Sequence, residues 1–413
     1  MPEPKVRFMK DDGSRYPAWK EYSISDLFTK IGNKNKDGQN TNVITNSAEF
    51  GLIPQRDYFD KDIAVEGNTG NYTIIQTGDF VYNPRKSSYA PMGPFNCYRM
   101  EEDGIVSPLY SCLRPKGVLN PEYLLWYFQT DKWYGYVNDH GAQNGARHDR
   151  VGMTDKILMG IPVTAPCEEE QRKIANFLTS VDEVITASEE EVANLETQKK
   201  AVMKKIFSQE VRFKRADGSD FPEWEEKTIG DVTDSLTGYA FESELFTEKG
   251  IRLLRGMNIK RGDLDFSEDI CKYWPTSEGL EKFLLQENDL IVQMDGALVG
   301  KSFGLVKAEH LPALLVQRVT RLRGDSTIIQ LLYQILSTGE FDKDMKLNQT
   351  STAVPHISLK DITGYGICIP SDPEEQRLIA DFLSNFDEAI VAAKKELELW
   401  KELKKGLLQQ MFV

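Results

Sequence analysis

The stretch EEEQRKIANFLTSVDEVITASEEEVANLETQKKAVMKKIF, residues 168–207, decides how this chain is organised. A related stretch, EEQRLIADFLSNFDEAIVAAKKELELWKELKKGLLQQMF, occupies residues 374–412. Neither contains proline, and Gly406 is the only glycine in either. Because proline and glycine disfavour a helix interior most strongly, both stretches are predicted to form long helices.

Apolar residues in both stretches recur at alternating steps of four and three positions. This spacing keeps one stripe of side chains facing a partner helix and is typical of a coiled coil. The two stripes have the same phase, which favours packing of the helices on each other over separate packing of each on a globular core. The predicted seam consists of Ile174, Leu178, Val181, Ile185 and Leu195 in the first stretch, and Ile379, Leu383, Phe386, Ile390, Leu397 and Trp400 in the second.

The exceptions to the apolar pattern also coincide in the two stretches. Ser188 in the first corresponds to Ala393 in the second, and Lys199 corresponds to Lys404. A polar residue in a coiled-coil seam commonly fixes the register of the helices at some cost in stability. We therefore expect the two lysines to specify how the helices pair.

A tandem repeat surrounds these helices. Residues 6–28, VRFMKDDGSRYPAWKEYSISDLF, return as VRFKRADGSDFPEWEEKTIGDVT at residues 211–233. The D-G-S element is typical of a tight turn, and Trp19 and Trp224 are predicted to anchor it on a core. The sequences between share little beyond a pattern of strands. The prediction is a variable domain, a helix, a second variable domain and a second helix, at residues 1–165, 166–209, 210–370 and 371–413.

Length and composition indicate a folded protein of more than one unit. With 413 residues the chain is too long for one ordinary core, and 40% of its residues are hydrophobic. Its five cysteines form no C-x-x-C pair, which fits free thiols in a reducing compartment. The charged N-terminus is unlike a signal peptide, and no apolar run approaches the ~20 residues that span a bilayer. We expect a soluble, cytoplasmic protein.

The formal net charge of −14 at pH 7 is an argument against a nucleic-acid-binding protein, but a weak one. Net charge governs solubility and the overall field, whereas contact with nucleic acid needs only a local basic surface. Acidic helical faces are also typical of solvated coiled-coil flanks and of docking surfaces for partner proteins. The charge therefore leaves DNA binding open.

The sequence offers little support for an enzyme. Residues 289–302, DLIVQMDGALVGKS, resemble a phosphate-binding loop, but the glycine spacing G-x-x-x-x-G-K-[ST] is not met. The four histidines show no metal-ligand spacing, and no nucleophile elbow of the G-x-S-x-G type is present. We therefore predict no catalytic residue and no metal site in this chain.

Polar and basic loops are better represented. Arginine and lysine can bind guanine or phosphate, and asparagine and glutamine can pair with adenine edges. Each such loop taken alone is more typical of a solvated surface, but corresponding loops occur in both domains. The candidate DNA-binding residues are Arg85, Lys86, Ser87, Asn144, Arg147 and His148 in the first domain, and Arg255, Arg261, Lys301, Asn348, Gln349 and His356 in the second.

Over essentially its whole length, the chain resembles the specificity subunit of type I restriction-modification enzymes. Besides the tandem arrangement, the resemblance rests on E-E-Q-R-x-I-A-x-F-L at residues 169–178 and 374–383, and on D-G-S-x-aromatic-P-x-W at the start of each domain. A G-x-A-F-x-S segment at residues 238–243 adds to it. These motifs are specific in combination.

The resemblance implies a mixed α/β fold. Two globular target recognition domains would be separated by two long helices that form an antiparallel coiled coil, in a pseudo-twofold tandem repeat. Each domain would bind one half of a split, asymmetric site in double-stranded DNA. The chain itself would be non-catalytic, and would direct methylation and cleavage by its partners.

The resemblance also implies which partners and cofactors to expect. Two DNA methyltransferase subunits would dock on this chain, and restriction/translocase subunits could join them. S-adenosylmethionine, ATP and magnesium are expected on those subunits, and no cofactor is expected on this chain.

A second hypothesis is a coiled-coil scaffold that binds protein partners and no DNA. The overall acidity is its best support. The two hypotheses differ in one property. A specificity subunit with its methyltransferase partners binds DNA with an affinity that falls steeply as salt rises, whereas a scaffold has no such affinity.

Overall fold

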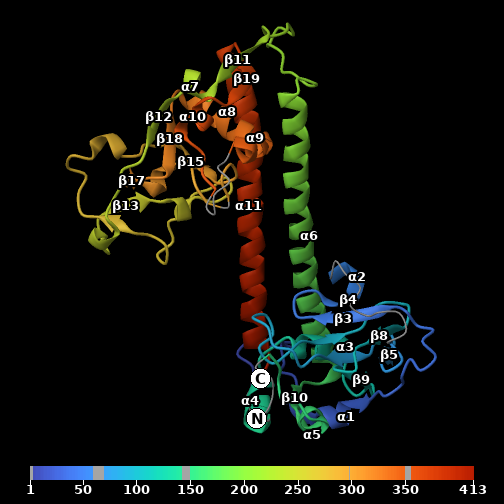
Figure 1. The fold of residues 1–413 in the computed structure, drawn as a ribbon. Coiled ribbons are helices and arrows are strands. Elements are labelled where there is room, and N and C mark those ends of the chain that lie inside the picture. The colour runs from blue at the N-terminus through green and yellow to red at the C-terminus, as the bar shows by residue number, and fades with distance from the viewer. Residues whose placement is uncertain (1–2, 59–68, 142–148, 297, 349–354) are drawn as a thin grey trace. The chain divides into compact units, whose positions relative to one another are not determined.

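The computed structural model describes residues 3–58, 69–141, 149–296, 298–348 and 355–413. They form two units: unit 1 comprises residues 1–189 and 395–413, and unit 2 comprises residues 190–394 (Figure 1). The long helices are α6 (Glu168–Phe207) and α11 (Pro373–Met411), and each contributes one part to each unit. Both predicted helices are therefore confirmed.

The described strands of unit 1 form three sheets. β1 (Lys20–Ser23) pairs antiparallel with β10 (Pro162–Ala165). The second sheet is fully antiparallel and has the order β2 (Phe28–Lys30), β9 (Ser111–Pro115), β6 (Phe80–Tyr82), β7 (Phe95–Cys97). The third, in which β3 and β8 run parallel, has the order β4 (Gly51–Pro54), β3 (Val43–Ser47), β8 (Gly104–Val106), β5 (Thr73–Ile75). The short helices are α1 (Ile24–Leu27), α2 (Gln55–Tyr58), α3 (Pro121–Phe128), α4 (Tyr134–His140) and α5 (Asp155–Gly160).

The described strands of unit 2 repeat this plan. β11 (Trp224–Thr228) pairs antiparallel with β19 (Gly366–Pro370). The antiparallel sheet has the order β12 (Asp234–Thr237), β18 (Val319–Arg323), β15 (Leu290–Gln293), β16 (Phe303–Leu305). The third sheet has the order β14 (Tyr273–Trp274), β13 (Ile251–Leu254), β17 (Ala313–Leu315), with β13 and β17 parallel. The α-helices are α7 (Ile229–Val232), α8 (Ser326–Ser337), α9 (Glu340–Asn348) and α10 (Leu359–Thr363), and the 3₁₀ helices are η1 (Ser243–Leu245), η2 (Gly256–Asn258), η3 (Glu281–Phe283) and η4 (Ala308–His310).

The two units therefore share the two-stranded sheet and the four-stranded antiparallel sheet although their sequences differ, whereas the third sheet has four strands in unit 1 and three in unit 2. The sheet β2-β9-β6-β7 corresponds to β12-β18-β15-β16, strand by strand. Equivalent ion pairs support the match: Arg114 binds Asp79 with an Nε–Oδ1 distance of 2.8 Å, and Arg323 binds Asp289 at 2.6 Å. Both aspartates are buried, at the turn that precedes β6 or β15. The predicted tandem repeat of mixed α/β domains is confirmed.

The core of unit 1 is rich in aromatic side chains. Phe95 of β7 stacks on Phe128 of α3, with ring centroids 3.9 Å apart. Phe28 and Phe80 pack against the same cluster. Trp19 is 2% exposed and packs edge-on against a tyrosine of α3, as predicted for an anchor of the entry turn. Burial of large aromatic rings supplies much of the hydrophobic stabilisation of such a small domain.

The beginnings of the long helices belong to these globular cores. Ile174 and Leu178 of α6 are buried in the aromatic core of unit 1. Ile379 and Leu383 of α11 are buried in the core of unit 2, together with Met203 from the end of α6. The predicted seam is thus partly a helix-to-domain interface, because each helix starts directly after a strand of its own domain and covers that domain.

The helices pair antiparallel, as the resemblance implied. In unit 1, Lys404 of α11 binds Asp182 of α6, with an Nζ–Oδ1 distance of 2.5 Å. In unit 2, Lys199 of α6 binds Asp387 of α11 at 2.6 Å. Each seam lysine is therefore paired with a carboxylate on the other helix. Val181, Ile185, Ile390 and Leu397 are buried, while Leu195, Phe386 and Trp400 are half-buried.

The repeated V-R-F and E-E-Q-R motifs form one structural element in each unit. Arg7 binds Glu170 with an Nε–Oε1 distance of 2.9 Å, and Arg212 binds Glu375 at 3.1 Å. Both glutamate side chains are fully buried. Hydrogen bonds to the glutamates raise the pKa of Arg7 and of Arg212. These pairs join the entry segment of each domain to the first turn of its helix.

No helix in the described part of the chain is long and apolar enough to cross a membrane. Among the same residues, no group of three or more histidine, cysteine, aspartate or glutamate side chains is arranged to hold a metal ion.

Candidate nucleic-acid interface

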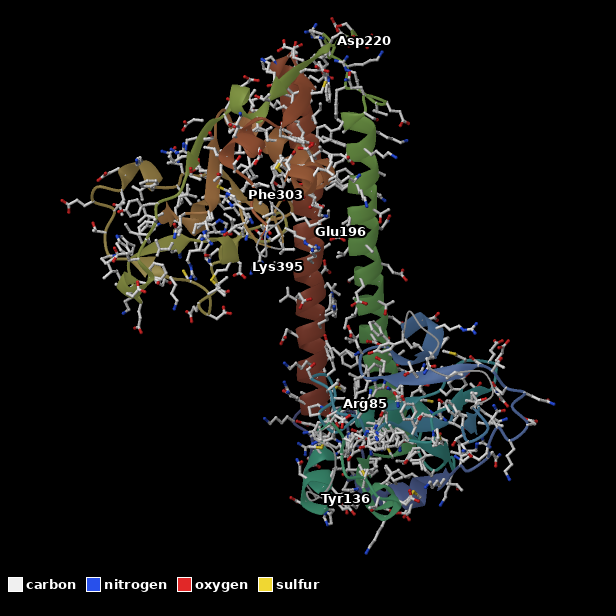
Figure 2. The ribbon with its side chains drawn as sticks, in the orientation of Figure 1. Arg85, Tyr136, Glu196, Asp220, Phe303 and Lys395 are labelled. Atoms are coloured by element: carbon white, nitrogen blue, oxygen red, sulfur yellow. The ribbon has the colours of Figure 1, made fainter. Side chains whose placement is uncertain are left out.

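In unit 1, two loops that are distant in sequence lie side by side at the end of β6. Arg85 and Arg150 form a β-bridge, and Figure 2 labels Arg85 in this region. The Lys86 amide donates to the Asp149 carbonyl at 2.9 Å, and the Val151 amide donates to the Pro84 carbonyl at 2.8 Å. The basic segment that begins at Arg85 and the end of the 143–150 loop thus share one edge of the domain. The sequence predicted both loops but not their adjacency.

Unit 2 builds the same junction at the end of β15. Asp295 and His356 form the equivalent β-bridge. The Gly296 amide donates to the Pro355 carbonyl at 3.0 Å, and the Ile357 amide donates to the Met294 carbonyl at 2.9 Å. We call these two places the reading edges: residues 84–88 with 149–151 in unit 1, and residues 294–296 with 355–357 in unit 2.

The reading edge of unit 1 presents cations to solvent. Arg85, Lys86 and Ser87 are exposed, and no ion pair of Arg85 or Lys86 occurs within the described residues. Tyr89, at the tip of the same loop, is 70% exposed. Exposed cations beside an exposed aromatic ring can bind phosphate oxygens and base edges. Asn144, Arg147 and His148 lie outside the described residues and stay predictions.

The reading edge of unit 2 has a different character. An acidic residue, Asp295, stands where unit 1 has Arg85, and His356 stands where unit 1 has Arg150. The His356 ring is half-buried, and its neighbour Ser358 caps α10 through Asp361. Hydrogen bonds from Ser358 lower the pKa of Asp361. Equivalent positions on equivalent sheets therefore carry different side chains in the two units.

The remaining candidates of unit 2 are largely engaged within the domain. Lys301 lies 3.7 Å from Asp342, and Asn348 donates to the Asp344 side chain at 3.0 Å. Arg261 is exposed and bridges Phe303, labelled in Figure 2, through its backbone. Gln349 lies outside the described residues.

Arg255 has an internal role that its sequence context did not predict. Its Nη2 donates to the Ile270 carbonyl at 2.5 Å, and its guanidinium lies over the Phe246 ring, 5.8 Å from the centroid. Burial lowers the pKa of Arg255. The side chain therefore ties two loops of the domain together instead of presenting a free cation.

One residue that contacts the reading edge of unit 2, Arg318, is absent from the sequence candidates. Arg318 ends the turn between β17 and β18, and its Nη1 donates to Asp295 Oδ2 at 3.0 Å. In the sequence, Gln317-Arg318 is an ordinary polar turn between two apolar strands. Only the long-range pairing with Asp295 identifies it, so no signal in the local sequence could have found it.

The comparisons with known proteins agree with this architecture. Residues 222–399 match a family model described as "Type I restriction modification DNA specificity domain". Over 320 residues the chain is 28% identical to the type I restriction enzyme MjaVIII specificity subunit of Methanocaldococcus jannaschii. The aligned region covers 74% of this chain and 72% of that protein. Over 180 residues it is 30% identical to the EcoAI specificity subunit of Escherichia coli, covering 43% of this chain and 30% of that protein.

Solved structures share the fold over the whole chain. The S subunit of a type I restriction-modification system from M. genitalium aligns with a TM-score of 0.59 and 14% identity, covering 100% of this chain and 99% of that one. A chain from a structural study of type I complex assembly aligns with a TM-score of 0.57 and 16% identity, covering 96% and 98%. At these identities the likeness concerns the fold alone. The resemblance predicted from the sequence motifs is confirmed.

Proposed function

Because residues 222–399 belong to the type I DNA specificity domain family, we propose that this chain selects the DNA site of a type I restriction-modification complex. Unit 1 would read one half of a split site and unit 2 the other. The observation that carries this proposal is the pair of reading edges. They have the same backbone pairing on the same sheet topology, but Arg85 and Arg150 in one are replaced by Asp295 and His356 in the other.

This pattern fits two readers of different base sequences. The shared backbone would place each edge against DNA in the same way, and the side chains would determine which bases are accepted. Since the side chains differ, the two half-sites would differ, and the whole site would be asymmetric. Identical edges would instead have favoured a palindromic site.

In the proposed complex, this chain and its partner subunits have different roles. It would supply recognition, and two methyltransferase subunits would transfer a methyl group to an adenine in each half-site. Restriction/translocase subunits could join the complex and cleave DNA. S-adenosylmethionine, ATP and magnesium would be bound by those partners. The sequence, which has no phosphate-binding loop of correct spacing, supports a non-catalytic role for this chain.

The proposal is tested by DNA binding of the chain in complex with its methyltransferase partner, at several salt concentrations. A specificity subunit predicts an affinity that falls steeply as salt rises, because phosphate contacts release counterions. The net charge of −14 favours the alternative, a protein scaffold without DNA affinity. A complex that forms but shows no salt-dependent binding to DNA supports that alternative.

A further inference from the structure

We infer that Arg318 reads a guanine in the half-site of unit 2. This inference rests on the proposed function and names one residue that determines specificity. Arg318 follows the turn residue Gln317 and precedes β18. Its side chain is 68% exposed, at the same edge as Asp295 and His356.

The backbone of Arg318 is in a conformation that arginine rarely adopts. Its φ is +67°, in the left-handed region that favours glycine. A side chain other than glycine, asparagine or aspartate is strained there, and such strain persists where the surroundings impose it and often at functional sites. The ion pair with Asp295 does not explain the arginine by stability, because the Arg318 side chain is 68% exposed and ion pairs with a solvent-exposed partner contribute little. A glycine would serve the fold better.

The surroundings hold this turn at four points. The Gln317 amide donates to the Tyr239 carbonyl at 2.7 Å, and the Met294 amide donates to the Arg318 carbonyl at 3.0 Å. Tyr239 in turn donates from its amide to the Leu315 carbonyl, and the Gly238 amide donates to the Val319 carbonyl. The turn that carries Arg318 is thereby fixed on both sides.

Gly238 shows why the G-x-A-F-x-S segment has its sequence. A Cβ at this position would lie 2.1 Å from the carbonyl oxygen of Val316, so only glycine permits the close approach. The segment thus braces the turn before Arg318 and does not itself need to touch DNA.

Asp295 orients the arginine and leaves part of it free. The carboxylate accepts from Nη1, while Nη2 and Nε form no hydrogen bond within the described residues. The Asp295 side chain is 17% exposed, whereas that of Arg318 is 68% exposed. An arginine whose remaining donors form a planar fork suits the O6 and N7 acceptors of guanine in the major groove. Because Asp295 already orients the arginine before DNA binds, the side chain loses little conformational entropy on binding.

The equivalent strand pairings place Ser111 opposite Tyr82 and Thr320 opposite Val292, so the position of unit 1 that corresponds to Arg318 is Leu109. Leu109 is half-buried. A leucine side chain has no hydrogen-bond donor and cannot form the arginine fork, so the reading of guanine at this position belongs to unit 2 alone. The effect of changing Arg318 should therefore be confined to one half-site.

The test uses the full chain in complex with its methyltransferase subunits, after the split site of the unaltered complex has been determined. Arg318→Gly removes the side chain and relieves the backbone conformation, so the variant should melt at an unchanged or higher temperature. We expect it to accept other base pairs at one G·C position of one half-site. The preference for G·C over other base pairs at that position should fall about tenfold to a hundredfold, which is the usual effect of losing one bidentate arginine–guanine contact. The other half-site should be read as before.

Arg318→Lys separates base reading from a structural ion pair. Lysine keeps the charge and the pair with Asp295 but has no planar fork, so it should not restore the guanine preference. Full restoration by lysine would overturn the inference. So would an Arg318→Gly variant that discriminates as well as the parent at every position, or that loses affinity equally for all sites.

Lys249→Ala is the matched control. Lys249 is an exposed cation of the same domain, and it precedes the start of β13, whereas Arg318 lies beyond the opposite end of the β13–β17 pair. Its removal should leave the selected site unchanged. If the unaltered complex methylates no split site at all, the proposed function fails, and that outcome is distinct from failure of the Arg318 inference.

Discussion

At the residue scale, the buried arginine–glutamate pairs are the most consequential contacts in the repeat. Arg212 reaches Glu375 with two nitrogens, Nε and Nη2, at 3.1 and 2.9 Å, and also donates to the carbonyl of Pro222. The Glu375 side chain is fully buried. A buried carboxylate without a cation is costly, so the arginine cannot be removed alone without a large loss.

We predict that Arg212→Met lowers the free energy of unfolding by roughly 3–5 kcal/mol, the usual cost of leaving a buried charge uncompensated. Urea denaturation followed by circular dichroism measures it. The control is the double variant Arg212→Met with Glu375→Leu, which removes both charges and should recover most of the loss. A single variant as stable as the parent would contradict the role of the pair.

Three short helices begin with the same pair of residue types. Ser23 with Asp26, Thr228 with Asp231, and Ser358 with Asp361 each form a capping box. Hydrogen bonds at these caps lower the pKa of all three aspartates. A depressed folded-state pKa contributes stability above the unfolded-state value, near 4, and that contribution is lost as pH falls through the folded-state pKa.

We therefore predict a pH-dependent effect of Asp231→Asn. The variant should melt below the parent at pH 6, where the parent carboxylate is charged, and the difference should shrink steadily as pH is lowered from about 5 to 2. Melting curves of both proteins across this range test it. Glu225→Gln removes a neighbouring exposed acid on β11 and is the control for the loss of a surface charge. A difference in melting temperature between variant and parent that grows as the pH falls would contradict the predicted direction.

At the element scale, the seam lysines specify the pairing of α6 and α11. Lys199 and Lys404 occupy equivalent positions of the two helices, and so do their partners Asp387 and Asp182. In unit 2 the Asp387 carboxylate also accepts from Gln334 of α8, at 2.7 Å. The pair thus links the two helices and the globular domain at one point.

We predict that Lys199→Asp destabilises unit 2 by placing like charges together, and that adding Asp387→Lys restores most of the loss. A coupling of roughly 1–2 kcal/mol is expected for a close, partly buried pair. A double-mutant cycle in urea measures it. Lys200→Asp, on an exposed position of the same turn, is the control. Additive effects of the two substitutions would show that the lysine does not specify the register.

At the scale of the whole molecule, the repeat predicts that one half can substitute for the other. A chain of residues 1–209 contains Asp182 and Lys199 but lacks Lys404 and Asp387. Because the helices are equivalent and antiparallel, Asp182 of one copy can pair with Lys199 of a second copy, twice in a symmetric dimer.

We predict that residues 1–209 form a dimer, measured by light scattering coupled to size exclusion. With methyltransferase subunits, the dimer should direct methylation to a symmetric site composed of two copies of one half-site. Lys199→Asp should weaken the dimer, and Asp182→Lys added to it should restore pairing. A monomer at high concentration, or an asymmetric site, would contradict the pseudo-twofold model.

The parts that the sequence predicted are those set by local pattern and repetition. The helix boundaries follow from the absence of proline and from the apolar stripe, and the tandem repeat follows from matched motifs such as those containing Trp19 and Trp224. Leu195 and Trp400 fit the same stripe but are only half-buried, because burial depends on the neighbouring domain as well as on the partner helix.

The reading edges could be predicted only in part. The sequence shows that Arg85 and Arg150 are basic, but the backbone bridge that brings them together depends on long-range packing. For the same reason the sequence could not show that the Arg255 side chain donates to the Ile270 carbonyl, or that the Arg318 side chain donates to the Asp295 carboxylate. Charge and loop character are local properties, whereas the availability of a side chain is not.

The most direct test of the central claim is a map of methylated adenines in cells that contain the partner methyltransferase, with and without this chain. We predict N6-methyladenine in a split, asymmetric motif that occurs only when the chain is present. Exchanging residues 210–370 for those of another specificity subunit should change one half of the motif and leave the other. Methylation that is the same with and without the chain, although the complex forms, would contradict the proposed function.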